Sequence, residues 1–175
     1  MSFYRKVAEF SKKFLKPHLL YRYGFNLSPM YRRSTGRIIY VSEDLLEIKI
    51  KIPISYKNRN YMNSMFGGSM FSAVDPIPIV QLINLLDHRF IMWDKSAEIS
   101  FLRPVEEDLY ASFSYSMEEL DEIKQRVSSE KEIEIIKSTK LTDKKGKHVF
   151  CEVKKKIYIA DKAHYREKRK KRLSQ

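Results

Sequence analysis

A single long apolar segment sets the architecture of this chain: residues 69–87, SMFSAVDPIPIVQLINLLD. Apart from its two prolines, the pattern predicts a helix that is buried on most of its sides. A proline inside a helix removes a backbone hydrogen bond and clashes with the preceding turn, and both Pro76 and Pro78 fall here. We therefore expect a central helix that is either kinked or broken and restarted.

Hydrophobic and polar residues alternate on both sides of this segment, which predicts strands. Residues 37–42 and 45–52, separated by Glu43-Asp44, predict a hairpin with one buried and one solvated face. Four more strand-like runs follow the apolar segment: 91–104, 108–117, 133–142 and 148–160. Between the second and third of these, residues 117–130 predict an acidic helix. The order predicts an α+β fold in which an antiparallel sheet wraps around one long central helix.

Two helices are expected before the hairpin. Residues 3–15 carry four apolar residues on one helical face: Phe3, Val7, Phe10 and Phe14. Pro17 is expected to end this helix. We prefer to interpret it as packed on the domain or on a partner subunit, and the alternative is a helix on a membrane surface. Ser28-Pro29 predicts the start of a short second helix, with Gly36 at its C-terminal end.

The positive charge of the chain is concentrated at its ends. The net charge is +12, to which residues 1–35 contribute +7 and residues 162–175 contribute +6, while the part between them sums to −1. Basic ends attract polyanions such as nucleic acid, anionic lipid or a phosphorylated cofactor, although solvated chain ends are the plainer interpretation and the one we prefer. The expected organisation is basic N-terminal helices at 1–36, a domain at 37–160 and a basic C-terminal tail at 161–175.

Several classes of protein are excluded by what the 175 residues lack. With one cysteine, Cys151, neither an intrachain disulfide nor a cysteine-rich zinc site can form, and an alternating strand predicts that this thiol is packed rather than reactive. The four histidines lack carboxylate or cysteine neighbours at ligand spacing, so no metal is expected. The P-loop, dinucleotide-binding and serine-hydrolase motifs are missing. We see neither a transmembrane run nor a secretory signal and expect a cytoplasmic protein.

The segment that carries chemical information is NYMNSMFGGSMFSAVDP, residues 60–76. Gly67-Gly68 lies where a loop becomes a helix, so another backbone or a ligand can approach closely, and the first amides of the helix suit an oxyanion or a polarised carbonyl oxygen. Asp75 follows about two helical turns later. A purely structural interpretation is also open: Asp75-Pro76 would start a second helix, and the glycines would allow tight packing.

This segment resembles the motif of the hotdog-fold thioesterase superfamily, in the branch of the phenylacetyl-CoA thioesterase-like proteins. The spacing of Asn60, Gly67, Gly68 and Asp75 matches that motif. ISFLRPV at 99–105, followed by DLYASFSY, is similar to the central strand pair of the family. The resemblance covers residues 37–160 and is strongest to an uncharacterised bacterial subgroup, a domain of unknown function, with Phe-Gly-Gly in place of His-Gly-Gly.

The resemblance implies a homodimer, or a dimer of dimers, that binds acyl-CoA or another acyl thioester at the subunit interface, with no cofactor beyond the coenzyme A of the substrate. Asp75 would be general base or nucleophile, Asn60 would orient the water or thioester, and the Gly67 amide would polarise the carbonyl. Asp94 falls where some relatives place a water-holding polar residue. The positions implied for substrate binding are Asn63, Met65, Phe66, Gly68 and Asp94. The same order of elements implies an acyl tunnel near Met62, Met65, Phe66 and Phe71, and an Asp75 buried beside it would have a raised pKa.

Two departures from the motif leave the function open. Phe66 replaces the histidine, so a polar contact near the thioester is lost, and Asn63 replaces a glycine, although Asn tolerates the left-handed conformation. Our first hypothesis is an acyl-CoA thioesterase-type hydrolase. The second is a non-catalytic acyl-CoA or fatty-acyl binding protein on the same fold. The third is an interaction protein whose basic ends hold nucleic acid or membrane.

Overall fold

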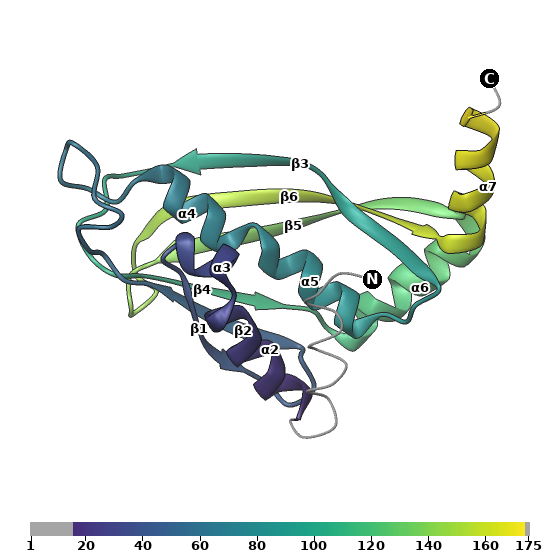
Figure 1. The fold of residues 1–175 in the computed structure, drawn as a ribbon, viewed down its shortest axis with the longest axis horizontal. Coiled ribbons are helices and arrows are strands. Elements are labelled where there is room, and N and C mark those ends of the chain that lie inside the picture. The colour runs from purple at the N-terminus through teal and green to yellow at the C-terminus, as the bar shows by residue number, and fades with distance from the viewer. Residues whose placement is uncertain (1–15, 174–175) are drawn as a thin grey trace.

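The computed structural model describes residues 16–173, which form an antiparallel six-stranded sheet packed on a central helix (Figure 1). The α+β class and the sheet around a central helix are confirmed. The elements are α2 (Pro17–Leu27), α3 (Pro29–Arg33), β1 (Arg37–Val41), β2 (Glu47–Ile52), α4 (Gly67–Val74), α5 (Pro76–Leu85), β3 (Phe90–Phe101), β4 (Leu109–Ser114), α6 (Met117–Glu130), β5 (Glu132–Thr142), β6 (Val149–Asp161) and α7 (Lys162–Leu173).

The strands lie in the order β1-β2-β4-β5-β6-β3, so β1 and β3 are the edges of the sheet. Pairing extends along the strands within β1-β2-β4 and within β5-β6-β3, with one register shift in each of the pairs β1-β2, β3-β6 and β5-β6. Between these halves, β4 and β5 share only the pair Tyr110 and Thr142, so the strands separate beyond this point. The alternating pattern of the hairpin is confirmed, because Ile48, Ile50 and Ile52 of β2 are all fully buried.

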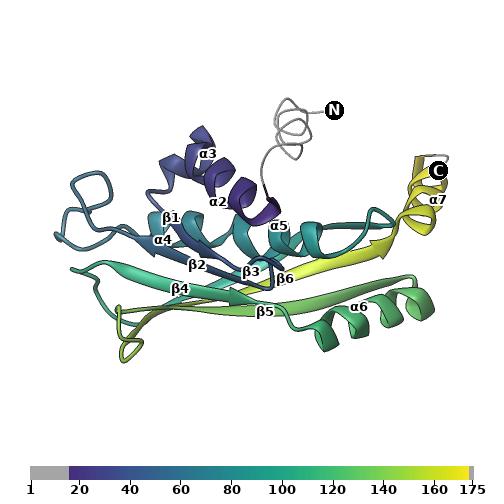
Figure 2. The ribbon, with the colours of Figure 1, turned by 90° about the horizontal axis from the view of Figure 1, so that it is seen from below.

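The central helix runs through its prolines rather than breaking at them. Asp75 links α4 to α5 with helical backbone angles, φ −47° and ψ −52°, and the two helices lie end to end across one face of the sheet (Figures 1 and 2). Buried phenol groups donate hydrogen bonds to backbone carbonyls around this junction: Tyr31 to Ala73 at 3.1 Å and Tyr115 to Pro78 at 3.1 Å. These bonds fix the helix to its neighbours where proline removes its own amide donors.

Helices α2 and α3 cover the side of the central helix that faces away from the sheet (Figure 2). The sequence did not predict α2: Pro17, expected to end a helix, is instead its first residue. The short α3 is confirmed, but Gly36 does not end it, since the positive φ of 64° belongs to Thr35. A Cβ on Gly36 would lie 2.8 Å from that of Ala73, so the glycine allows close packing. The helix expected at residues 3–15 lies outside the described residues.

Helix α6 has the bounds that its sequence predicts and packs on a second hydrophobic cluster. Its stripe of Leu120, Ile123 and Val127 is buried against the end of α5 and the inner faces of β5 and β6, whereas Met117 is exposed. Ser116 starts the helix by accepting a hydrogen bond from the Glu119 amide at 3.1 Å.

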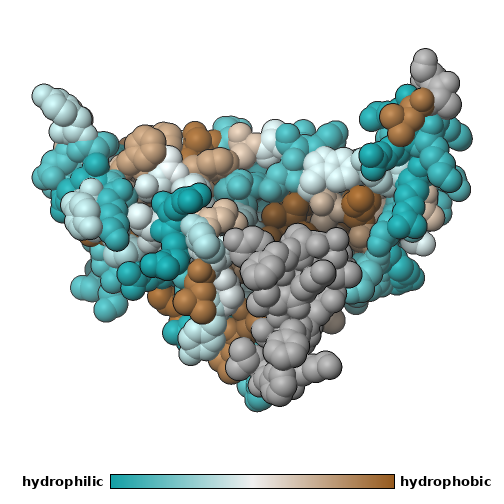
Figure 3. Space-filling view, viewed as in Figure 1, coloured by the Kyte–Doolittle hydropathy of each residue, from teal (hydrophilic) through white to brown (hydrophobic). Residues whose placement is uncertain are grey.

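The basic C-terminal residues form helix α7, which projects from the end of β6 (Figure 1). Tyr165 packs edge-on against Trp93, with ring centroids 5.1 Å apart, and Lys168 bonds both oxygens of Glu132 at 2.5 and 2.7 Å. Most of the remaining surface of the helix is hydrophilic, apart from the exposed Leu173 at its end (Figure 3). In residues 16–173, none of the helices has the length and hydrophobicity that crossing a membrane requires.

Candidate functional site

Asp75 lies at the junction of α4 and α5 with its side chain directed away from the helix backbone. It forms no capping hydrogen bond at the start of α5, although the sequence pattern offered that role. Instead, its Oδ1 atom accepts a hydrogen bond from Lys155 at 2.5 Å, and its carbonyl oxygen accepts a second at 2.9 Å. The side chain is 42% exposed, so it is not buried beside an apolar tunnel as expected. Its carboxylate is therefore anchored on one side and accessible on the other.

Lys155, the residue that holds Asp75, was not among the predicted site residues. It lies in β6 on the inward face that it shares with Val153 and Ile157, and only 1% of it is exposed. Among the described residues it is the one charged side chain that is buried. A lysine at an inward position of an apolar strand is the signal that could have identified it, because lysine is almost never fully buried unless paired.

Asp94 completes this cluster from the edge strand β3. Its Oδ2 atom lies 2.7 Å from Lys155 Nζ, and its other oxygen, Oδ1, is buried without a hydrogen-bond partner in the described structure. A register shift between Asp94 and Ser96, as in a β-bulge, leaves Asp94 opposite the buried Ile157, and bulges commonly re-aim side chains next to functional sites. Burial raises the pKa of Asp94, an effect that the nearby Lys155 partly offsets.

Gly67 and Gly68 begin α4, and two aromatic rings explain why both are glycine. A Cβ at Gly67 would lie 2.7 Å from the ring of Phe101, and one at Gly68 would lie 2.3 Å from the ring of Phe66. Neither glycine amide donates a hydrogen bond to another described residue. The start of α4 thus has two free N–H groups beside two half-exposed rings.

The loop before α4 is a turn that Asn60 organises from within. The Asn60 Oδ1 atom accepts hydrogen bonds from the amides of Met62 and Ser64 at 2.9 and 3.1 Å, and its Nδ2 atom donates to the Ser64 hydroxyl at 3.0 Å. Asn63 adopts the left-handed conformation, with φ of 61°, as the replacement of glycine by Asn predicts. The side-chain oxygen of Asn60 is therefore engaged in its own loop. One N–H of the side-chain amide is left for a ligand.

An open hollow of about 720 Å³ lies next to this turn. It is lined by Asn60, Met62, Ser64, Met65, Gly67, Met70, Phe101, Leu102, Arg103, Pro104, Val105 and Glu106. Two of the expected tunnel residues, Met62 and Met65, belong to this lining, whereas Phe66 and Phe71 do not. Flexible methionine side chains adapt to apolar groups of different shape, and Figure 3 shows apolar side chains gathered over the end of β3 and the start of α4. The methionine and phenylalanine side chains of the hollow suit an acyl group, and Arg103 and Glu106 add one charge of each sign to its lining.

The predicted site residues form two groups within one chain. Asn60, Met65 and Gly67 line the hollow, with Asn63, Phe66 and Gly68 in the same loop and helix start, while Asp75 and Asp94 meet at Lys155. Asp75 lies eight positions after Gly67 along the helix, a rise of about 12 Å along the axis. One copy of the chain therefore does not bring the Gly67 amide and the Asp75 carboxylate to the same thioester.

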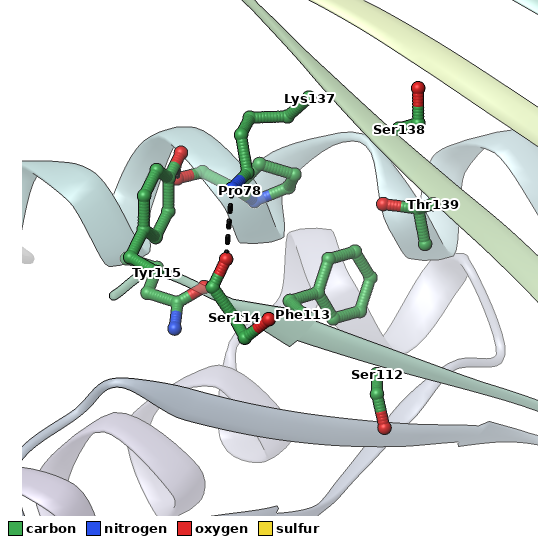
Figure 4. A pocket seen from close by; sticks show the side chains of 9 residues that line it. Pro78, Ser112, Phe113, Ser114, Tyr115, Lys137, Ser138 and Thr139 are labelled. Atoms are coloured by element: carbon green, nitrogen blue, oxygen red, sulfur yellow. Dashed lines mark hydrogen bonds between the residues drawn. The ribbon is translucent and has the colours of Figure 1, made fainter. Parts of the chain in front are cut away.

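A second, smaller cavity of about 90 Å³ opens where β4 and β5 separate (Figure 4). It is lined by Pro78, Gln81, Ser112, Phe113, Ser114, Tyr115, Lys137, Ser138 and Thr139. Lys137 bridges the two strands by donating to the Ser114 carbonyl at 2.9 Å. Gln81 is fully buried, and its Oε1 atom has no partner among the described residues. A cavity of this size has room for a few water molecules that would satisfy such an atom, but not for an acyl chain.

No group of three or more metal-binding side chains occurs in the part of the chain that the structure describes. Cys151 is fully buried, and burial raises the pKa of its thiol to about 11.

Comparison with known proteins identifies both a family and a fold. A family model described as DUF4442, a domain of unknown function, matches residues 22–159. No curated protein matches the sequence.

Among solved structures, a Pseudomonas aeruginosa protein of unknown function, named a probable thioesterase, is 20% identical with a TM-score of 0.72, over 82% of this chain and 95% of that one. A mutant thioesterase of the same organism is 8% identical with a TM-score of 0.61, over 85% and 97%. A Haemophilus influenzae thioesterase is 9% identical with a TM-score of 0.52, over 92% of each chain. At these identities the similarity establishes the hotdog fold and not the reaction.

Proposed function

This chain belongs to the DUF4442 family, and from that membership and the geometry of the site we propose that it hydrolyses acyl-CoA or a related acyl thioester. One observation carries the proposal: Asp75, the residue that the resemblance to the phenylacetyl-CoA thioesterase-like branch makes the base or nucleophile, is held by an ion pair and not by a helix cap. Its side chain is 42% exposed, so a water molecule or a thioester can reach it.

In the reaction that we propose, Asp75 acts as a general base. Its carboxylate takes a proton from a water molecule while the water oxygen attacks the thioester carbonyl carbon. The free amide of Gly67 stabilises the negative oxygen of the tetrahedral intermediate. When the carbon–sulfur bond breaks, the thiolate recovers the proton from Asp75, and the products are a carboxylic acid and a free thiol.

The reaction needs two copies of the chain, because Gly67 and Asp75 lie too far apart within one. We therefore include a homodimer in the proposal, with the hollow of one protomer facing the Asp75 of its partner. The edge strand β3 supports this arrangement. Its residues 95–98 are exposed, and its outer edge pairs with none of the described strands. An exposed edge strand is a ready template for pairing with another chain.

A second candidate function is binding of an acyl-CoA or fatty-acyl ligand without turnover. The observation that favours it is the Asn60 side chain, whose oxygen is engaged in its own turn and so cannot orient a water molecule. Phe66, in the position of the family histidine, offers no hydrogen bond either. In this case the methionine-lined hollow binds the acyl group, and the thioester bond of an acyl-CoA stays intact.

A panel of acyl-CoA substrates of graded chain length distinguishes the two functions. Release of free thiol, followed with a chromogenic thiol reagent, is expected for at least one chain length if the protein is a hydrolase. Saturable binding of the same ligands, measured by calorimetry with no thiol released, would establish the binding protein and overturn the hydrolase.

A further inference from the structure

The buried lysine at the site is not explained by folding alone. Lys155 stands between Val153 and Ile157 on the inward face of β6, where an apolar residue of similar length would fill the same space. Replacing a buried ion pair with apolar residues is often neutral or even stabilising. The presence of an ammonium here therefore calls for a reason beyond packing.

The contacts of Lys155 show what the ammonium does. It donates hydrogen bonds to the Oδ1 atom and to the backbone carbonyl oxygen of Asp75, at 2.5 and 2.9 Å. Asp94 lies on its remaining side at 2.7 Å. Three oxygen atoms thus surround the three N–H groups of the ammonium. None of the described residues donates a hydrogen bond to Asp75 Oδ2. One carboxylate oxygen of Asp75 is therefore held by Lys155, and the other is left for a ligand.

We propose that Lys155 is a positioning residue: it holds the Asp75 carboxylate in one orientation, with its second oxygen directed to the attacking water. This inference rests on the proposed function, because it assigns Lys155 a task in the same reaction. Asp94 is a second carboxylate partner of the same ammonium and holds it from the side of β3.

Substitution of the two residues that meet at the ammonium provides the test. Lys155→Met removes the positive charge with little change in length, and Asp94→Asn removes the neighbouring negative charge with none. Lys155→Met loses both hydrogen bonds to Asp75, whereas Asp94→Asn keeps them. The two variants should therefore differ in kcat.

With the full chain and its best acyl-CoA substrate, we expect Lys155→Met to lower kcat at neutral pH at least about tenfold. We expect its KM to change little, because Lys155 does not line the hollow that we assign to the acyl group. Asp94→Asn should lower kcat less than Lys155→Met does, because it keeps both hydrogen bonds to Asp75. Lys154→Met, on the solvent face of the same strand, is the matched control and should behave as wild type. A purely structural lysine would lower the yield of folded protein without lowering the kcat of the folded fraction.

A second readout separates failure of this inference from failure of the proposed function. Carbon-13 NMR of aspartate-labelled protein follows the carboxyl groups without any turnover, with the Asp94 signal assigned by its loss in Asp94→Asn. Lys155 lowers the pKa of Asp94, so Lys155→Met should raise it. If no thioester is hydrolysed but this shift is seen, the hydrolase is wrong and the charge coupling stands. If turnover is seen and Lys155→Met keeps the wild-type kcat, the positioning role is overturned. If Lys155→Met does not fold, the double variant Lys155→Met with Asp94→Asn, which leaves no carboxylate buried without its ammonium, decides by the same criterion.

Discussion

Lys155 Nζ lies 2.5 Å from Asp75 Oδ1, although 80 residues separate them in the chain. The contact joins the middle of the last strand to the junction of the central helix. It decides between two roles for Asp75 that the sequence leaves open, because a carboxylate engaged by a buried ammonium is not capping a helix. The same contact sets what substitution of Asp75 will do to the folded protein.

We predict that Asp75→Ala destabilises the protein more than Asp75→Asn does. Alanine leaves Lys155, whose side chain is 2% exposed, with Asp94 as its one carboxylate partner. Removing one partner of a buried ionic hydrogen bond costs about 1–3 kcal/mol. Asparagine keeps an oxygen in the same place and should cost less. Urea denaturation of both variants measures the difference in free energy of unfolding. Equal stability of the two would show that Lys155 does not depend on this contact.

Gly24→Ala and Gly36→Ala should change stability in opposite directions. A Cβ at Gly24, inside α2, meets nothing within 4 Å, so alanine should stabilise the helix by up to about 1 kcal/mol. A Cβ at Gly36 would lie 2.8 Å from Ala73 and 3.0 Å from the Tyr31 hydroxyl, and such overpacking costs about 1–3 kcal/mol. Thermal unfolding of the two variants beside wild type checks the prediction. A stabilising Gly36→Ala would mean that α3 does not pack on α4 as described.

Cys151 should resist thiol reagents as long as the protein is folded. It is fully buried, and burial raises its pKa to about 11, so at pH 8 there is almost no thiolate to react. Labelling with a chromogenic disulfide should be slow in buffer and complete in denaturant. Rapid labelling of the native protein would contradict the packing of β6.

Helix α7 should loosen in acid, because Glu132 holds it. Hydrogen bonds from Lys168 and Tyr158 lower the pKa of Glu132 below its ordinary value of 4.5. The stabilisation is therefore present above pH 4.5 and is lost as the pH falls through the lower, folded-state pKa. Trp93, the one tryptophan, packs against Tyr158 and Tyr165 of this region, so its fluorescence reports the change.

Glu132→Gln is the control for this acid transition. It removes the titrating group and keeps the shape of the side chain, so Trp93 emission at neutral pH should already resemble that of the acid form. If the variant shows the wild-type transition at low pH, another group is responsible for it.

Much of the fold follows from local patterns that the sequence displays. Alternation predicts the strands, and the stripe of Leu120, Ile123 and Val127 predicts α6 with its bounds. Helix α2 was missed because a proline such as Pro17 can end a helix or start one. The packing of Tyr21 against the central helix, where its hydroxyl donates to the Ile77 carbonyl, decides between these two roles. Gly36 was expected at a helix end because its contact with Ala73 of α4 joins residues far apart in the sequence, and no local pattern indicates it.

Part of the candidate site could be proposed from the sequence. The resemblance to a family motif implies Asn60, Gly67 and Asp75, and the left-handed conformation that Asn63 adopts is one that Asn tolerates. Lys155 was missed because it stands in a run of three lysines, residues 154–156, which is typical of a solvated segment. That it meets Asp94 depends on a register shift in β3, which no local pattern of the sequence predicts. Charges that meet across elements depend on register and packing, and these are properties of the folded chain.

The measurement that tests the central claim most directly is thiol release from acyl-CoA by wild-type protein and by Asp75→Asn, side by side. We expect turnover by wild type on at least one chain length. We expect kcat to fall by at least about a hundredfold in Asp75→Asn, with thermal stability close to that of wild type. Wild-type turnover by Asp75→Asn would contradict the role of Asp75, and no thiol release by folded wild-type protein on any acyl-CoA would contradict the hydrolase itself.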